Sequence, residues 1–423
     1  MLEKFDNPNF GFNHLKVLKW KLLIQDLIGF GKFSISGNVK HLDAAMQWIT
    51  RAQDATPDRG VARMFSLLKG WESSYPETTG YIIPTLLEYY RFSEVGDYKR
   101  RALEMADWLM DIQMPCGAIQ AGPVDAIEKV PTIFNTGQAL FGFVAAYKET
   151  SDHHYLLAAL KATDWLVEHQ KSDGSWRRFS SPFAGYTDNT YNARTAWGIY
   201  EVYEITDNGK YLAAALKNLK LAVSRQNQIG WFSDNCLVDR DRPLLHTIGY
   251  TIEGILAVGL ARSDEVLIRS AELAARALIT VQMKNGSLAG CYDDKWRPQA
   301  RWSCLTGVAQ IAVCWWRLHS ALGDDCFREA ARRANAFLKS TQDLKNQHPG
   351  IRGAIKGSYP ICGKYCSYEY PNWAAKFLAD SLIYQDRIDG DAVPVKVTLR
   401  QESRLTADSN KSNSQRLMHE HTD

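Results

Sequence analysis

A repeat of about 57 residues constrains the fold of this chain more than any other feature. Small residues stand at equivalent positions of successive repeats, namely Gly80, Gly137, Ala193, Gly249 and Gly307. Each lies near the start of a mostly apolar segment with helical spacing, and a more polar amphipathic segment precedes each apolar one. The apolar segments start near Pro76, Phe134, Thr190, Leu245, Ser303 and Tyr368. This alternation predicts paired helices that stack against the next pair.

The amphipathic segments share a second feature, which is that each of them ends in glutamine. These residues are Gln53, Gln113, Gln170, Gln226, Gln282 and Gln342. Six pairs of helices with few strand-like runs predict an all-α fold, an (α/α)6 toroid whose apolar helices form a closed inner ring and whose amphipathic helices wrap it. The expected boundaries are an N-terminal extension over residues 1–37, the toroid over 38–387 and a C-terminal tail over 388–423.

The two ends of the chain differ from the repeats. Residues 14–33 predict an amphipathic helix whose apolar residues are interrupted by lysines, without the features of a secretion signal. We expect this helix to cap the body of the protein, and contact with a membrane surface is the less favoured alternative. The tail is rich in Ser, Asn, Asp and Arg, which predicts a short strand over Val393–Leu399 followed by disorder.

Composition excludes some classes of partner. Lys and Arg number 50 against 47 Asp and Glu, so the formal net charge is +3, and without a long basic run nucleic acid is not expected. The aromatic content of 11% suits a cleft that binds sugar faces or isoprenoid chains. Eight scattered cysteines indicate reduced thiols and a cytoplasmic location. No cofactor and no metal are expected, because His and carboxylate residues do not recur at ligand spacing.

Polar residues near the start of the inner helices are the candidates for chemistry. In a toroid these helix starts face the mouth of the central cavity. His246, Tyr250 and Glu253 stand at i, i+4 and i+7 and therefore share one helical stripe. A His or Tyr that transfers a proton and a Glu that orients it would form an acid/base unit, and Tyr81 occupies the position equivalent to Tyr250 in another repeat.

A second set of residues is expected to bind the substrate. It comprises Glu77, Asn135, Gln138, Asp188, Tyr191, Asn192, Arg194, Trp197 and Glu369. Arg194 presents a planar fork that matches a carboxylate, and Asn192, Gln138 and Asn135 could assist it. Neutralising a uronate carboxylate makes the neighbouring carbon proton removable. The favoured interpretation is therefore a lyase or C-5 epimerase acting on a uronate-containing oligo- or polysaccharide, either free or lipid-linked.

Other interpretations remain open at this stage. A glycoside hydrolase would draw two carboxylates from Glu77, Asp188, Glu253 and Glu369. A glycan-binding or scaffold protein would need no catalysis at all, so enzymatic activity itself is not established. His246 could equally be a capping or core histidine, and Tyr81 and Tyr250 could be packing residues.

Two sets of short motifs carry family resemblances. The loops Gln170–Trp176, Gln226–Trp231 and Gln282–Leu288 resemble the Gln/Trp repeat of terpenoid-cyclase and protein-prenyltransferase toroids, which implies an isoprenoid alternative. The acid-rich motif of that family is absent, since Thr187-Asp188-Asn189 supplies one carboxylate.

The segment Trp71–Thr78, followed by an apolar helix, resembles the C-terminal domain of glucuronyl C-5 epimerases. The helical part over about residues 38–386 also resembles cytosolic proteins of bacterial capsule and exopolysaccharide clusters. These resemblances imply a role in polysaccharide biosynthesis or modification.

Overall fold

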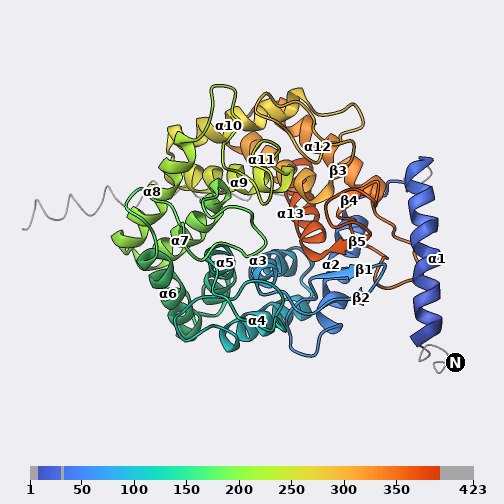
Figure 1. Ribbon diagram of the computed structural model, residues 1–423, viewed down its shortest axis with the longest axis horizontal. Coiled ribbons are helices and arrows are strands. Elements are labelled where there is room, and N and C mark those ends of the chain that lie inside the picture. The colour runs from blue at the N-terminus through green and yellow to red at the C-terminus, as the bar shows by residue number, and fades with distance from the viewer. Residues whose placement is uncertain (1–7, 30–32, 391–423) are drawn as a thin grey trace, which may run out of the picture. The chain divides into compact units, whose positions relative to one another are not determined.

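The computed structural model describes residues 8–29 and 33–390. Within these residues the helices form the (α/α)6 toroid that the sequence predicts, in one compact unit that ends at Ile388 (Figure 1). The outer helices are α2 (Asn38–Asp54), α4 (Gly96–Asp111), α6 (His153–Glu168), α8 (Gly209–Ser224), α10 (Glu265–Thr280) and α12 (Asp325–Thr341). The inner helices are α3 (Pro76–Ser93), α5 (Ile133–Thr150), α7 (Ala193–Thr206), α9 (Leu245–Arg262), α11 (Leu305–Leu322) and α13 (Asn372–Asp389). The tail was expected over residues 388–423, but Ile388 and Asp389 still belong to α13. The rest of the tail from residue 391 on, with its expected strand over Val393–Leu399, lies outside the described residues.

The repeated small residues are the points where neighbouring inner helices touch. A Cβ added to Gly80 of α3 would lie 2.8 Å from the Cα of Ala139 in α5, and one added to Gly137 would lie 2.7 Å from the Thr195 side chain in α7. Hydrogen bonds close the ring between α13 and α3, where Asn372 Nδ2 donates to Thr78 Oγ1 at 2.8 Å. Close backbone approach therefore explains why the repeat keeps a small residue at this position.

The glutamines join each outer helix to the next. In every case the side-chain amide donates to a backbone carbonyl of the following outer helix, as Gln226 does to Ser270 at 2.8 Å. The equivalent bonds are Gln53 to Arg101, Gln113 to Ala158, Gln170 to Ala214, Gln282 to Ala330 and Gln342 to His41. The last of these links α12 to α2, so the outer ring also closes.

Removing one of these glutamines is expected to weaken the fold measurably. Gln226 also donates to Gly230 at 3.1 Å and accepts from Ser270 Oγ at 2.7 Å. Gln226→Ala leaves these partners unpaired, so we expect the free energy of unfolding in urea to fall by about 1–3 kcal/mol. The matched control is Gln228→Ala, an exposed residue two positions away. A loss as small as that of the control would contradict a role for the glutamine.

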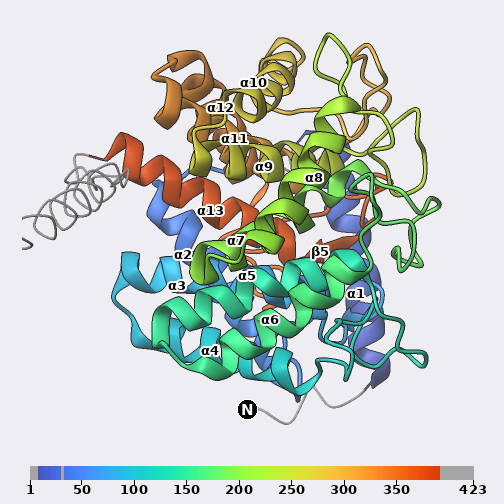
Figure 2. The same cartoon turned by 90° about the vertical axis from the view of Figure 1, so that its left-hand side faces the viewer.

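The two ends of the ring differ in their connections. Two residues separate each inner helix from the next outer helix, whereas loops of 20 to 30 residues lead from each outer helix to the next inner one. The long loops gather where the inner helices begin, on the right-hand side of Figure 2. This end of the ring therefore supplies the loop residues from which a functional site can be built.

Short strands in these loops were not expected from the sequence. β1 (Met64–Ser66) pairs antiparallel with β2 (Gly70–Trp71) and with β5 (Glu369–Pro371), and β3 (Ser303–Cys304) pairs with β4 (Ser358–Tyr359). Each has two or three residues, too few for an alternating pattern to show. β3 and β5 occupy residues that were expected to form the first turns of α11 and α13. α11 therefore begins two residues, and α13 four residues, later than the sequence predicts.

The N-terminal helix α1 (Pro8–Leu27) packs on the body as a cap. Leu22 is buried, and the buried Asp26 forms an ion pair with Lys356 at 2.5 Å. Val17 and Trp20 are exposed, so the helix also carries apolar side chains on its outer surface. Of the helices in residues 8–29 and 33–390, none is both long and apolar enough to cross a bilayer.

Candidate functional site

A cavity of about 150 Å³ opens where the inner helices begin, and we call it the first cavity. Its wall comes from the starts of α3, α5, α9 and α13 and from four of the long loops. The lining residues are Arg63, Tyr75, Glu77, Phe134, Asn135, Ser181, Phe183, Tyr191, Leu237, His246, Thr247, Tyr250, Tyr365, Cys366 and Trp373. Five residues proposed from the sequence, Glu77, Asn135, Tyr191, His246 and Tyr250, thus lie together.

Glu77 is the acidic residue of this lining. It follows Pro76 in the first turn of α3, and no hydrogen bond or ion pair to its carboxyl group is formed by the described residues. Burial raises the pKa of Glu77 to about 7, although the positive charges of Arg63 and Arg194 act in the opposite direction. Near neutral pH, a substantial fraction of Glu77 therefore keeps its proton and can donate it.

Arg63 brings a positive charge to the same cavity. Its backbone is fixed beside β1 by hydrogen bonds to Ser73 and Asn372. Its Nη1 lies 3.3 Å from Glu72 Oε2, and its side chain is still 38% exposed. Its buried Nε has no hydrogen-bond partner among the described residues. The guanidinium therefore has donors left for an anion.

Aromatic side chains form much of the remaining wall. The ring centroids of Phe134 and Tyr191 lie 5.1 Å apart, and Phe134 lies 5.0 Å from Tyr250. Trp373 Nε1 donates to the Tyr365 hydroxyl at 2.8 Å. Rings held in this way offer flat apolar faces with polar edges, which suits the binding of a sugar ring.

His246 is neutral and fixed. Its Nδ1 lies 2.6 Å from Gln310 Oε1, and burial lowers the pKa of His246 to about 4. With Nδ1–H donating to the glutamine, Nε2 carries the lone pair and can only accept. The ring packs on Tyr250 at a centroid distance of 4.3 Å.

A buried layer closes the bottom of the first cavity. Arg194 is 1% exposed, forms an ion pair with Glu253 and donates to Gln138 Oε1 at 2.8 Å. The Tyr81 and Tyr250 hydroxyl groups meet above it at 3.3 Å. Burial raises the pKa of both phenols well above the usual value, so both stay protonated. We call these five residues the central layer.

Below the central layer lies a second cavity of about 390 Å³, at the end of the ring where the inner helices finish. Its lining residues are Tyr81, Pro84, Thr85, Leu87, Glu88, Arg91, Phe141, Val144, Ala145, Lys148, Arg194, Trp197, Glu201, Glu253, Val313, Arg317, Lys376, Asp380, Ile383, Tyr384 and Arg387. This lining includes four site residues proposed from the sequence, namely Tyr81, Arg194, Trp197 and Glu253. The proposed site residues are therefore split between the two cavities.

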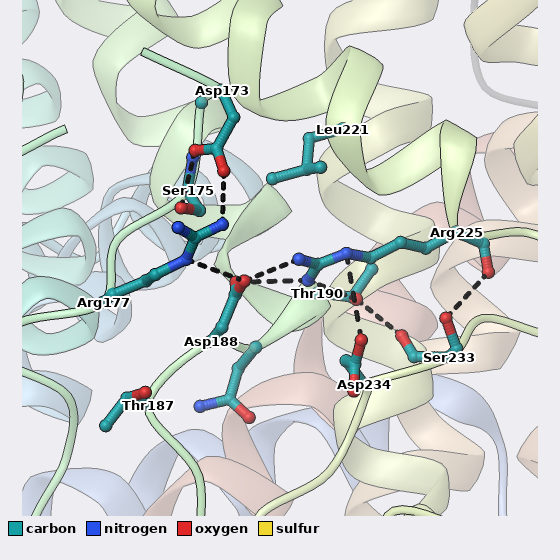
Figure 3. Close-up of polar contacts among 12 residues, drawn as sticks. Asp173, Ser175, Arg177, Thr187, Asp188, Thr190, Leu221, Arg225, Ser233 and Asp234 are labelled. Carbon is teal, nitrogen blue, oxygen red and sulfur yellow. Dashed lines mark hydrogen bonds and ion pairs between the residues drawn. The ribbon is translucent and has the colours of Figure 1, made fainter. Parts of the chain in front are cut away.

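The remaining candidates lie in neither cavity. Asp188 is held by Arg225 at 2.7 Å and lies 3.6 Å from Arg177, which also pairs with Asp173 (Figure 3). This carboxylate braces the loop between α6 and α7. Gln138 and Asn192 are buried, and Glu369 lies in β5.

The candidate hydrolytic carboxylates are therefore separated. Glu77 lines the first cavity, Glu253 lines the second, and Asp188 and Glu369 line neither. Across the described residues, no three His, Cys, Asp or Glu side chains gather as a metal site would require. Arg63 was not among the residues proposed from the sequence, because it lies in the long loop before α3, outside the aligned positions at the helix starts.

The comparisons with known proteins reveal the fold but no sequence family. No family model and no curated protein matches the sequence. An unsaturated glucuronyl hydrolase specific for heparin has a TM-score of 0.66 at 16% identity, over 83% of this chain and 97% of its own. The unsaturated glucuronyl hydrolase of Bacillus sp. GL1 has a TM-score of 0.66 at 14% identity, over 83% and 97%. Cellobiose 2-epimerase from Bacillus thermoamylovorans has a TM-score of 0.62 at 11% identity, over 82% and 97%.

These structures correct the favoured interpretation of the sequence. A lyase or C-5 epimerase of polysaccharide biosynthesis was expected, whereas the similar structures are mainly hydrolases of unsaturated glucuronyl groups, so that expectation is wrong. The geometry supplies a physical reason, since Arg194 and Gln138, expected to neutralise a substrate carboxylate, are bonded in the central layer. The resemblances to capsule-cluster proteins, the C-5 epimerase domain and terpenoid cyclases stay predictions.

Proposed function

We propose that this protein is a glycoside hydrolase that removes an unsaturated uronic acid from the end of an oligosaccharide, with Glu77 as its acid. The observation that carries the proposal is a carboxyl group whose pKa is about 7, placed among aromatic side chains and beside a partly unpaired arginine. The hydrolases of similar fold add support, one of them in complex with dGlcA-GalNAc6S.

The single carboxyl group of the first cavity matters for the choice of reaction. Ordinary glycoside hydrolysis needs two carboxyl groups, one acid and one base or nucleophile. An unsaturated uronate has a ring double bond conjugated with its carboxylate, and water can add across that bond with the help of one group. We propose that Glu77 gives its proton to the double-bond carbon remote from the carboxylate, while water bonds to the carboxylate-bearing carbon and returns a proton to Glu77.

This addition leads to cleavage without a further catalyst. The carbon that accepts the water oxygen also carries the ring oxygen, so it becomes a hemiketal. Opening of the hemiketal gives a ketone and turns the glycosidic carbon into a hemiacetal, which releases the next sugar with its oxygen. One water is consumed and Glu77 ends protonated, as it began. His246, as a neutral acceptor, is suited to orient the water.

The substrate class is tested with a panel of disaccharides. Purified protein is incubated with an unsaturated uronyl disaccharide, the saturated uronyl equivalent and cellobiose, and the products are identified by mass spectrometry. We expect cleavage of the first alone, with release of the second sugar. Cleavage of the saturated uronate at an equal rate would contradict the one-carboxyl mechanism, and no cleavage of any would contradict the hydrolase.

Arg63 is proposed to bind the substrate carboxylate, which gives a separate prediction. Arg63→Gln is expected to raise KM about 10- to 100-fold with kcat changed less than about threefold, since charged hydrogen bonds contribute about 1.5–3 kcal/mol. Initial rates with the unsaturated disaccharide measure this. Glu72→Gln breaks the same ion pair but keeps the guanidinium, so its KM should stay near the wild-type value. Equal effects of the two variants would show that the ion pair acts structurally.

A further inference from the structure

The second cavity is a separate chamber on the other side of the central layer. It is larger than the first, and its bottom is formed by buried residues that include Arg194 and Glu253. Tyr81 lines it while the hydroxyl partner of Tyr81, Tyr250, lines the first cavity. A ligand in one cavity therefore does not reach the other directly.

Positive charge exceeds negative charge in the lining of this cavity, which has six Lys and Arg residues but four Asp and Glu. Lys148 pairs with Glu201 at 2.9 Å, Lys376 with Asp380 at 2.5 Å, and Arg194 with Glu253. Glu88, the fourth carboxylate, is shared by Arg91 and Arg387. Each carboxylate of the lining is therefore already in an ion pair.

Arg317 is the cation left over. Within residues 8–29 and 33–390 it forms no ion pair, and its side chain is only partly buried. It lies in α11, five residues before the helix ends at Leu322. The favourable effect of a helix C-terminus on a cation fades within the last turn, so the helix itself does not account for this charge.

An aromatic side chain lies beside this arginine. The Arg317 Cζ atom is 5.6 Å from the centroid of the half-buried Trp197. Trp197 is fixed by a hydrogen bond from Nε1 to Glu201 Oε1 at 3.0 Å and by packing on Phe141 at 4.5 Å. A rigid indole next to an unpaired guanidinium offers both a surface for a ring and a partner for an oxyanion.

We propose that the second cavity binds a small anionic sugar, with the sugar ring against Trp197 and the carboxylate or phosphate on Arg317. A volume of about 390 Å³ falls within the range of small-molecule sites. Burial lowers the pKa of Lys376 at the bottom of the cavity, so this region gains from a nearby anion. The proposal does not depend on the hydrolase assignment, because it uses none of the residues of the first cavity.

Calorimetry on the Arg63→Gln protein tests this site, because that change removes the proposed anion partner in the first cavity. The probes are D-glucuronate, D-glucose 6-phosphate and neutral D-glucose at up to about 10 mM, since ligands of this size bind in the range of about 0.1–10 mM. We expect one equivalent of at least one anionic probe to bind and glucose not to bind. Comparing the binding of D-glucuronate with that of D-glucose 6-phosphate shows whether the site takes a sugar carboxylate or a sugar phosphate.

Three variants test whether the anion binds in the second cavity. Arg317→Gln should weaken the bound anion at least about tenfold, and Trp197→Leu should weaken it as well, which covers the case in which one of the two folds poorly. Arg269→Gln removes an exposed cation remote from both cavities and should change nothing. The absence of anion binding, equal binding of glucose, or binding that survives both Arg317→Gln and Trp197→Leu would overturn the proposal.

Discussion

Replacing Glu77 by glutamine is expected to lower kcat for the unsaturated disaccharide by about 10²- to 10⁴-fold, the usual contribution of a positioned acid. The glutamine has the same shape but no proton to give, and no hydrogen bond to the described residues is lost with the carboxyl group. Initial rates at saturating substrate measure the effect. A variant that keeps more than about a tenth of the wild-type kcat would contradict the role of Glu77.

The pH dependence of the wild type gives the same residue a second test. Because the protonated form acts and the pKa of Glu77 is raised to about 7, kcat/KM should fall about tenfold per unit as pH rises above about 7. The stability of the folded protein should change with pH in the same direction as kcat/KM. Glu77 binds its proton more tightly in the folded protein than in the unfolded chain, so the free energy of unfolding falls as pH rises towards 7. Glu77→Gln should therefore be at least as stable as the wild type at pH 8.

The largest effect on stability is expected for Arg194→Met. Arg194 and Glu253 are 1% and 3% exposed, and five aromatic rings lie within 5.4 Å of the Arg194 guanidinium carbon. Removing the arginine leaves the Glu253 charge buried without its partner, which costs about 3–5 kcal/mol. Urea unfolding at pH 7 measures the loss.

The double variant Arg194→Met with Glu253→Gln separates charge from shape. It removes both charges at similar volume, so we expect it to recover most of the stability lost by Arg194→Met. A double variant as unstable as Arg194→Met would show that packing of the arginine against the rings, rather than its charge, holds the central layer together. Arg269→Met is the exposed control.

The fold was predictable because its signals are local. Helical spacing, the small residues of the inner helices and the glutamines of the outer ones each recur once per repeat. Gly137 and Gln226 mark contacts between neighbouring repeats, so the closed ring follows from the pattern. The short strands were not predictable, since two or three residues have no period.

The candidate site was predictable only in part, and the stripe of His246, Tyr250 and Glu253 shows why. The three residues do share one side of α9, as their spacing predicts. Seven residues of helix, however, span about 10 Å along the axis. The stripe therefore crosses the central layer, with His246 and Tyr250 in the first cavity and Glu253 in the second.

Arg63 shows a different limit of the sequence. It lies in the long loop before α3, outside the positions that recur from repeat to repeat, and its place beside Glu77 depends on the pairing of β1 with β5, about 300 residues further along the chain. Pairing between such short strands, far apart in the chain, produces no recognisable sequence pattern near Arg63. Of the first cavity's charged residues, Glu77 could therefore be proposed from sequence and Arg63 could not.

The most direct test of the central claim follows the substrate double bond during the reaction. An unsaturated uronate absorbs ultraviolet light because its double bond is conjugated with the carboxylate. We predict that the wild type removes this absorbance and releases the second sugar in equal amounts, and that Glu77→Gln does neither. Release of the sugar with the absorbance unchanged would contradict addition of water to the double bond, and a rise in absorbance with a saturated uronate would restore the lyase.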